Sequence, residues 1–306
     1  MHTYVGSGPY CYANSVAMML GPAAPPPSVI EVLTGSPFGL ELIAGRLPLF
    51  DPFGWYPDRG IDDALGLLGW SFRREGAADD EQALALLRDA LEAGPAMAGP
   101  VEMGLLRHQP GMTGAVGADH FVVVLSVDDS RVLMHDPHGH PYATLPIGEF
   151  LAAWRGESIA YRTAPYTVRH DFRRVREVTA SSALRAVIPR AVAWLRGRDD
   201  VAVPPGTLGG AAAAERIAEM IESGLSPEAR GVLTEFAVRV GARRLADAAT
   251  ALTGLGLNEA AAVATRQARL VGSLQYDLVA GEPSAAAATM RELAPSYEEL
   301  AKCLAA

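Results

Sequence analysis

Cysteine is scarce in this chain: Cys11 and Cys303 are the only two among its 306 residues. Two thiols cannot build a disulfide framework or a four-thiolate zinc site, which excludes a small disulfide-stapled scaffold. A long apolar run is also missing from residues 1–30, where glycines and prolines interrupt the sequence repeatedly. This segment predicts neither a signal peptide nor a membrane span, so we expect a cytoplasmic protein that is not inserted in a membrane.

Basic side chains are in the minority. The chain has 26 Lys and Arg residues against 35 Asp and Glu residues, which gives a formal net charge of -9. A nucleic-acid binder needs a basic face that neutralises phosphates, and this balance argues against one. With 49% hydrophobic residues, the chain can form one large or two ordinary globular domains. A small molecule or another protein is the expected partner.

The composition changes near residue 165. Residues 1–165 carry 9 Arg against 19 acidic residues, whereas residues 166–306 carry 17 basic against 16 acidic residues. The first part mixes short strand and helix patterns, and the part from 181 onward is rich in alanine, with apolar residues at helical spacing. We therefore predict an α+β domain at 1–165, a basic linker at 166–180 and an all-α domain at 181–306. The basic cluster at 169–176 could instead dock an acidic carrier protein, and the helices could form a homodimer face.

Cys11 follows a glycine-rich lead and opens a predicted helix of two to three turns, which Gly21-Pro22 ends. In the first turn of a helix, unpaired backbone N–H groups and the positive end of the dipole favour a thiolate and lower the pKa of a thiol. The same N–H groups could receive an oxyanion. The plainer interpretation of Cys11 is a small buried hydrophobic residue.

Four of the seven histidines lie between residues 120 and 140. We predict a hairpin here, with strands at 120–127 and 131–136 and a three-residue turn at 128–130. In that register His120 and Asp136 are diagonal neighbours on one face, close enough for the carboxylate to hold the imidazole. A two-residue turn would move Asp136 to the opposite face.

A Cys at an electropositive helix end and a His oriented by an Asp are the parts of a Cys-His-Asp acyl-transfer site. The predicted catalytic residues are Cys11, His120 and Asp136. A metal site at His135, Asp136, His138 and His140 is the alternative. It is the weaker one, because strand alternation separates His135 from Asp136 and no helical HExxH spacing is present.

These motifs resemble a known family. The stretch from Cys11 through Leu91-Glu-Ala-Gly-Pro95 to Asp119-His-Phe-Val-Val and His135-Asp-Pro-His-Gly139 resembles the papain-like acyltransferases typified by the butirosin-biosynthesis enzyme. It is more distantly similar to the cysteine peptidases of bacteriocin exporters. The length and layout are also similar to those of the condensing enzyme of lincosamide assembly. The resemblance covers most of residues 1–165, and the helical tail resembles the appended domain that often follows.

The resemblance implies a papain-like cysteine-protease fold, with an N-terminal helix packed on an antiparallel sheet, followed by an all-α domain. It implies Cys11 as nucleophile, His120 as base and Asp136 as its orienting partner. The activity implied is transfer of an acyl or aminoacyl group from a carrier-protein thioester to an amine such as an amino sugar, in antibiotic biosynthesis. The substrate would arrive on the phosphopantetheine arm of an acyl or peptidyl carrier protein. The chain would need no cofactor or metal of its own.

One departure from the peptidase relatives bears on the reaction. They carry a Gln ahead of the nucleophile as an oxyanion donor, whereas the earliest Gln here is Gln82. The Cys11 N–H would need another donor, such as Ser7 or Tyr10. Loss of one such donor matters more for an amide than for a reactive thioester, which favours a transferase.

Three alternatives stay open at this stage. A cysteine peptidase or thioesterase would use the same three residues with water as the acceptor. A self-processing N-terminal nucleophile hydrolase would cut the chain before Cys11 and use the new amine as base. A catalytically inactive papain-like scaffold would use none of them.

Aromatic and acidic residues could shape an acceptor pocket. Trp55 and Trp70 could form its wall, although ordinary core positions are the plainer interpretation. Asp62, Asp63 or Glu102 could hold a cationic amine, with a simple surface position as the alternative.

Overall fold

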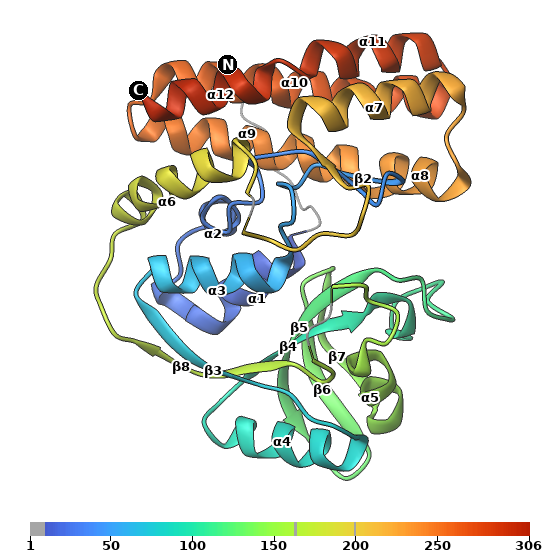
Figure 1. Cartoon of the computed structure of the whole chain (residues 1–306). Helices are drawn as coiled ribbons and strands as arrows, with labels where there is room; N and C mark the ends of the chain where they lie inside the picture. Colours follow the sequence, from blue (N-terminus) through green and yellow to red (C-terminus); the bar gives the residue numbers. More distant parts are fainter. Residues whose placement is uncertain (1–9, 162–163, 199) are drawn as a thin grey trace. The chain divides into compact units, whose positions relative to one another are not determined.

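The computed structural model describes residues 10–161, 164–198 and 200–306. The chain forms two compact units, and each contains separate stretches of sequence. A sheet unit contains residues 10–30 and 68–177, and a helical unit contains residues 31–67 and 178–306 (Figure 1). The structure confirms the expected mixture of helices and antiparallel strands with a helical C-terminal region.

The sheet unit is built on a six-stranded antiparallel sheet in the order β3-β8-β4-β5-β6-β7. Figure 1 shows β4 to β7 side by side. The strands are β3 (Trp70–Glu75), β4 (Ala96–Glu102), β5 (Asp119–Val127), β6 (Arg131–Asp136), β7 (His140–Pro146) and β8 (Val168–Arg174). The helices are α1 (Cys11–Leu20), the 3-10 turns Gly21–Ala23 and Met103–Leu105, α4 (Asp80–Glu92) and α5 (Ile147–Arg155).

The core of the sheet unit lies between its central strands and two helices. Val122 and Val124 of β5 pack with Leu87 of α4 and Phe150 of α5. All seven residues of β4 are buried, as expected for a strand in the middle of a sheet. Tyr12 of α1 packs edge-on against the ring of Phe121 on β5, with the ring centroids 6.1 Å apart. The centre of the sheet at β4 and β5 is therefore buried, and α1 contacts β5.

The helical unit contains a small antiparallel sheet of β1 (Glu41–Ile43), β2 (Leu47–Leu49) and β9 (Leu208–Gly209). Its helices are α3 (Pro57–Leu67), α6 (Ala180–Leu195), α7 (Gly210–Ser223), α8 (Pro227–Gly231), the π-helical turn Val232–Ala237, α9 (Val238–Gly254), α10 (Asn258–Ala280), α11 (Pro283–Leu293) and α12 (Ser296–Ala305). The remaining helix, α2 (Pro27–Leu33), contains the point at which the chain passes from the sheet unit to the helical unit. Gly241 is required in α9, because a Cβ there would lie 2.6 Å from the Phe50 side chain.

The predicted boundaries at 165 and 180 differ from this arrangement. The segment predicted as a linker, 166–180, contains β8, which pairs with β3 and β4 inside the sheet. Arg169 is fully buried there and lies 5.9 Å from the centroid of the Phe72 ring, and His170 bonds Glu75 at 3.0 Å. Residues 31–67, predicted as part of the first domain, belong to the helical unit. Most of the basic segment 169–176 therefore belongs to a strand of the sheet and is not a solvated linker.

Within the described residues, no single helix is long and apolar enough to cross a membrane. One bent pair, Cys11–Ala23 with Pro27–Leu33, reaches the required length and apolarity only when its two helices are taken together.

Buried carboxylates in the helical unit make its stability depend on pH. Glu41 is 2% exposed and accepts a hydrogen bond from Gly54 N at 2.9 Å. Burial raises the pKa of Glu41 to about 8, against a weaker opposing effect of that hydrogen bond and with added repulsion from Asp51. The buried Arg244 joins Glu31 and Asp51 nearby. Glu41 therefore keeps its proton in the folded protein at pH values where the unfolded chain has lost it.

Glu41→Gln is expected to stabilise the protein at pH 8. Between about pH 4.5 and pH 8 the unfolded chain binds fewer protons at this position than the folded protein, so stability falls as pH rises, by roughly 1.4 kcal/mol per pH unit from this group. Glutamine keeps an oxygen for Gly54 N and does not ionise. Urea unfolding at pH 5.5 and pH 8 measures the change. The exposed Glu292→Gln is the control, and equal pH dependence in wild type and Glu41→Gln would contradict this account.

Candidate functional site

His120 and Asp136 are hydrogen-bonded in the sheet unit, as the hairpin predicted. His120 Nε2 and Asp136 Oδ1 lie 2.7 Å apart. Both residues are buried, at 4% and 3% exposure. Strands β5 and β6 begin and end within one residue of the predicted strands.

The predicted turn was wrong, and a β-bulge compensates for it. Asp128 N donates to Arg131 O at 3.0 Å, and Val127 pairs with Val132, which is the register of a two-residue turn. That register, continued along the strands, would place Asp136 on the face opposite His120. The pairing shifts by one residue between Val124 and Ser126. Beyond the bulge, the predicted register holds, and Asp136 returns to the face that carries His120.

Asp136 accepts four hydrogen bonds, which saturate both of its oxygens. Oδ1 receives His120 Nε2 and, at 2.8 Å, the backbone N–H of His138. Oδ2 receives His108 Nε2 and Gln109 Nε2, each at 2.7 Å. Burial by itself would raise the pKa of this carboxyl, but the hydrogen bonds from His108 and His120 hold the pKa of Asp136 well below its ordinary value. Asp136 is therefore a fixed negative charge that orients the imidazoles around it.

Cys11 is the first residue of α1, and Tyr10 is the N-cap residue, whose side chain makes no capping bond. The first turn carries no acidic residue, so the positive end of the helix dipole falls on Cys11. Ser15, one turn later, donates through Oγ to Phe121 O at 3.1 Å, and Tyr12 packs on the Phe121 ring. Cys11 directly precedes Tyr12, and His120 directly precedes Phe121, in the sequence. Cys11 is partly exposed and carries a thiol rather than a disulfide.

Ser7 and Tyr10 were the residues predicted as a second oxyanion donor. Ser7 lies outside the described residues. Tyr10 is 1% exposed at the start of α1. The backbone N–H of Cys11, at the start of the helix, stays the candidate donor.

No role was assigned to His108 and Gln109 from the sequence, and His138 was considered only as a ligand of the alternative metal site. The first two lie on the irregular segment between the Met103–Leu105 turn and β5, where no periodicity signals a position. His108 Nδ1 is buried without a hydrogen-bond partner among the described residues, so a proton there would have no acceptor. His108 therefore contributes a hydrogen bond from Nε2 to the Asp136 carboxylate.

The carboxylate of Glu102 holds the irregular segment between the Met103–Leu105 turn and β5 by hydrogen bonds. The carboxylate is 1% exposed and accepts from Gly104 N at 3.0 Å, Val116 N at 3.0 Å and Gly117 N at 2.9 Å. The Ser158 hydroxyl also donates to it. Burial alone would raise the pKa of Glu102, but these hydrogen bonds lower it. Glu102 is thus committed to holding the segment that carries His108 and Gln109, and the expectation that it could hold a cationic amine was wrong.

Glu102→Ala is expected to destabilise the sheet unit by about 2 to 4 kcal/mol, because it leaves three backbone N–H groups without their acceptor. The hydrogen bonds of His108 and Gln109 to Asp136 should weaken as well, because the segment that carries these residues loses its anchor. Thermal unfolding followed by circular dichroism measures the first effect. Glu157→Gln, whose carboxylate is 71% exposed, is the matched control and should change stability by less than about 0.5 kcal/mol. Wild-type unfolding of Glu102→Ala would refute the role given to Glu102.

Other predicted positions have structural partners. Trp55 is buried in the helical unit and donates to Thr34 O at 2.8 Å, so it is a core residue rather than the wall of an acceptor pocket. Asp63 pairs with Arg190 at 2.7 Å. His135 Nδ1 accepts from Tyr142 N at 3.1 Å. Among the described residues, no group of three or more His, Cys, Asp or Glu side chains is placed to hold a metal ion.

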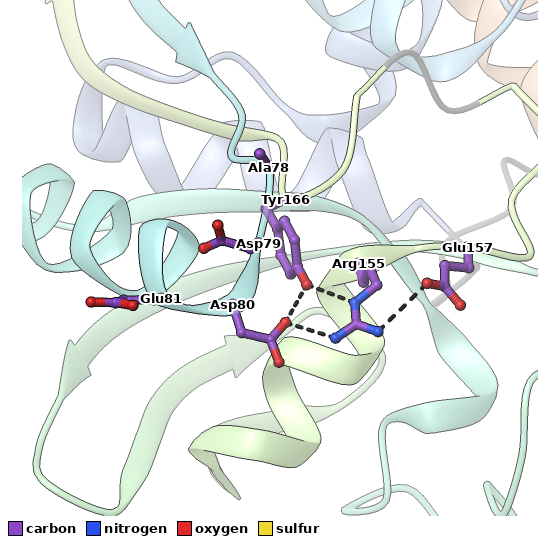
Figure 2. Close-up of a pocket in the computed structure, with 7 residues that line it drawn as sticks. All are labelled: Ala78, Asp79, Asp80, Glu81, Arg155, Glu157 and Tyr166. Atoms are coloured by element: carbon purple, nitrogen blue, oxygen red, sulfur yellow. Dashed lines mark hydrogen bonds and ion pairs between the residues drawn. The ribbon is translucent and has the colours of Figure 1, made fainter.

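A hollow in the sheet unit lies between the start of α4 and the end of α5. Figure 2 shows Asp80, Arg155 and Tyr166 converging there, while Glu81 points away. Tyr166 donates to Asp80, Arg155 Nε donates to the Tyr166 oxygen at 2.6 Å, and Arg155 Nη2 pairs with Asp80 at 2.7 Å. Hydrogen bonds from Tyr166 and Arg155 lower the pKa of Asp80. The carboxylate is already satisfied, so this group ties two helices to the segment before β8.

The comparisons with known proteins concern family relationship rather than activity. A family model described as the YobF C-terminal domain matches residues 204–305, which span β9 to α12. A Bacillus subtilis (strain 168) protein named uncharacterized protein YobF is 33% identical over 165 residues, which are 53% of this chain and 53% of that protein. The chain thus spans about half the length of the curated relative it matches. Neither match assigns a role to Cys11, His120 or Asp136.

Proposed function

We propose that the sheet unit is a papain-like acyltransferase that forms amide bonds through an acyl-enzyme on Cys11. The observation that carries the proposal is the bond between His120 Nε2 and Asp136. It leaves Nδ1 as the ring nitrogen of His120 that would take a proton. His120 lies on β5, the strand that α1 contacts, and Cys11 is the first residue of α1. A nucleophile, a base and an orienting carboxylate are the minimum set for this chemistry.

The acyl-enzyme would form through a tetrahedral intermediate. His120 Nδ1 takes the Cys11 proton, and Asp136 stabilises the resulting imidazolium. The Cys11 thiolate attacks the carbonyl carbon of a thioester on the phosphopantetheine arm of a carrier protein. The oxyanion forms beside the Cys11 N–H, the carrier thiol leaves with a proton from His120, and the acyl group stays on Cys11.

An amine then attacks the acyl-enzyme, the C–S bond breaks, and the amide is released while Cys11 returns as the thiolate. A thioester donor suits this site better than an amide, because thioester cleavage depends less on a full oxyanion hole. The resemblance of the Cys11, His120 and Asp136 motifs to the butirosin-type acyltransferases supports an amino sugar or similar amine as acceptor.

The experiment is incubation of the protein with an acyl-loaded carrier protein, with and without amines. Intact-mass spectrometry is expected to show an acyl adduct on Cys11, which amines consume to give amide. Release of free acid at a rate unaffected by any amine would show a thioesterase or peptidase instead. Absence of any adduct would end the proposal.

A further inference from the structure

Helix α1 contacts strand β5 at two points, and both of them are on Phe121. The ring of Tyr12 packs against the Phe121 ring, and the Ser15 hydroxyl donates to the Phe121 carbonyl at 3.1 Å. Ser15 is fully buried, and 106 positions separate it from Phe121 in the sequence. This hydrogen bond therefore ties the helix that begins at Cys11 to the strand that carries His120.

The Phe121 carbonyl lies beside a β-bulge in the neighbouring strand. The register of β4 and β5 shifts at Gly99 and Pro100, which together lie opposite Phe121, and the pairing resumes at His120. A bulge interrupts the hydrogen bonds of the ladder, and proline has no N–H to contribute to them. Ser15 supplies a donor from α1 at this interruption. The helix is thus attached to β5 one residue away from the proposed base.

The attachment point on α1 is equally close to the proposed nucleophile. Cys11 and Ser15 are four residues apart, so they lie one turn apart on the same face of the helix. A hydrogen bond weakens steeply when its distance or angle changes, whereas a hydrophobic contact such as that of Tyr12 has no fixed direction. The Ser15 bond therefore sets the register of α1 against β5 more strictly than the ring contact does.

We propose that Ser15 is a positioning residue, which places the Cys11 thiol against the His120 imidazole through its hydrogen bond to the Phe121 carbonyl. This inference rests on the proposed function and adds a residue to the machinery of that site. Loss of the bond would let α1 shift along β5 and would change the distance between the thiol and the imidazole. A displacement of about 1 Å in a catalytic group can cost about 10²-fold in rate.

Removal of the Ser15 hydroxyl changes no charge at the site. Helix α1 contains no acidic, basic or histidine side chain. His120 is bonded to Asp136, and the ring of His138 lies 6.1 Å from that of His120. Ser15→Ala leaves these groups in place. A change in the acidity of Cys11 in this variant would therefore report the position of the thiol relative to His120.

The test compares Ser15→Ala with a variant that loosens α1 without removing a hydrogen bond. Alanine is smaller than serine and favours a helix, so Ser15→Ala should fold. The matched control is Val16→Ala, because Val16 is equally buried on the same helix. The rate of Cys11 alkylation by iodoacetamide is measured as a function of pH, and thermal unfolding gives the stability of each variant.

We expect Ser15→Ala to slow alkylation of Cys11 about tenfold near pH 6 and to move its profile upward by about one pH unit. Val16→Ala should keep the wild-type profile although it unfolds at a lower temperature. A wild-type profile in Ser15→Ala would overturn the inference, as would equal shifts in both variants or failure of Ser15→Ala alone to fold. A wild-type Cys11 that ionises like an ordinary thiol would instead refute the proposed function.

Discussion

Cys11→Ala is expected to abolish both the acyl adduct and amide formation, with a loss of about 10⁴-fold or more in turnover, down to the rate of uncatalysed aminolysis. The Cys11 sulfur is the nucleophile that holds the acyl group in the proposed reaction, and alanine offers no atom that could replace it. Cys11→Ser should lose nearly as much, because a hydroxyl at that position is a far weaker acid than a thiol. Turnover of a thioester with amine, followed by mass spectrometry, measures the effect.

Cys303→Ala is the control for Cys11→Ala, because Cys303 lies on α12 in the helical unit. This variant should retain wild-type turnover. A Cys11→Ala protein that remains folded and keeps wild-type turnover would show that Cys11 is not the nucleophile. That result would favour the inactive-scaffold alternative for the sheet unit.

Asp136→Asn is expected to lower turnover by about 10³- to 10⁴-fold, because the amide NH2 group would face an imidazole N–H and force the wrong tautomer on a histidine. The fold should suffer as well. Four donors converge on the carboxylate, and each buried donor left without an acceptor costs about 1 to 3 kcal/mol. Single-turnover kinetics and urea unfolding at pH 7 measure the two effects.

The stability effect of Asp136→Asn has a defined pH dependence. The folded pKa of Asp136 is depressed, so the carboxylate stabilises the fold above the pKa of the unfolded chain, near 4, and this contribution is lost as pH falls. The difference in stability between wild type and Asp136→Asn should therefore shrink in acid. Asp129→Asn, on the exposed turn of the same hairpin, should show neither effect. A constant difference at all pH values would contradict the charge given to Asp136.

Local patterns predicted the elements that hold the proposed triad. The apolar run after His120 and the turn residues at 128–130 placed both strands, and Gly21 placed the end of α1. The face shared by His120 and Asp136 was predicted from a three-residue turn that does not exist. The bulge that restores it depends on packing between strands and leaves no signal in the spacing.

Residues outside regular patterns could not be predicted. His108 and Gln109 precede Asp136 by 28 and 27 positions, and they reach it because Glu102 fastens an irregular segment. Arg169 is typical of a solvated linker by composition, yet it is buried in β8. The chain passes between the two units after residues 30, 67 and 177. Long-range contacts decide these positions, and the change in charge content near residue 165 does not reveal them.

The rate of alkylation of Cys11 by iodoacetamide as a function of pH tests most directly whether this sulfur and His120 share one site. Cys303 in the same molecule is the internal reference, and peptide mass spectrometry separates the two. We predict that Cys11 reacts as a thiolate well below pH 8.5 and that His120→Gln moves its profile upward. A Cys11 profile that matches that of Cys303 and does not respond to His120→Gln would contradict the account.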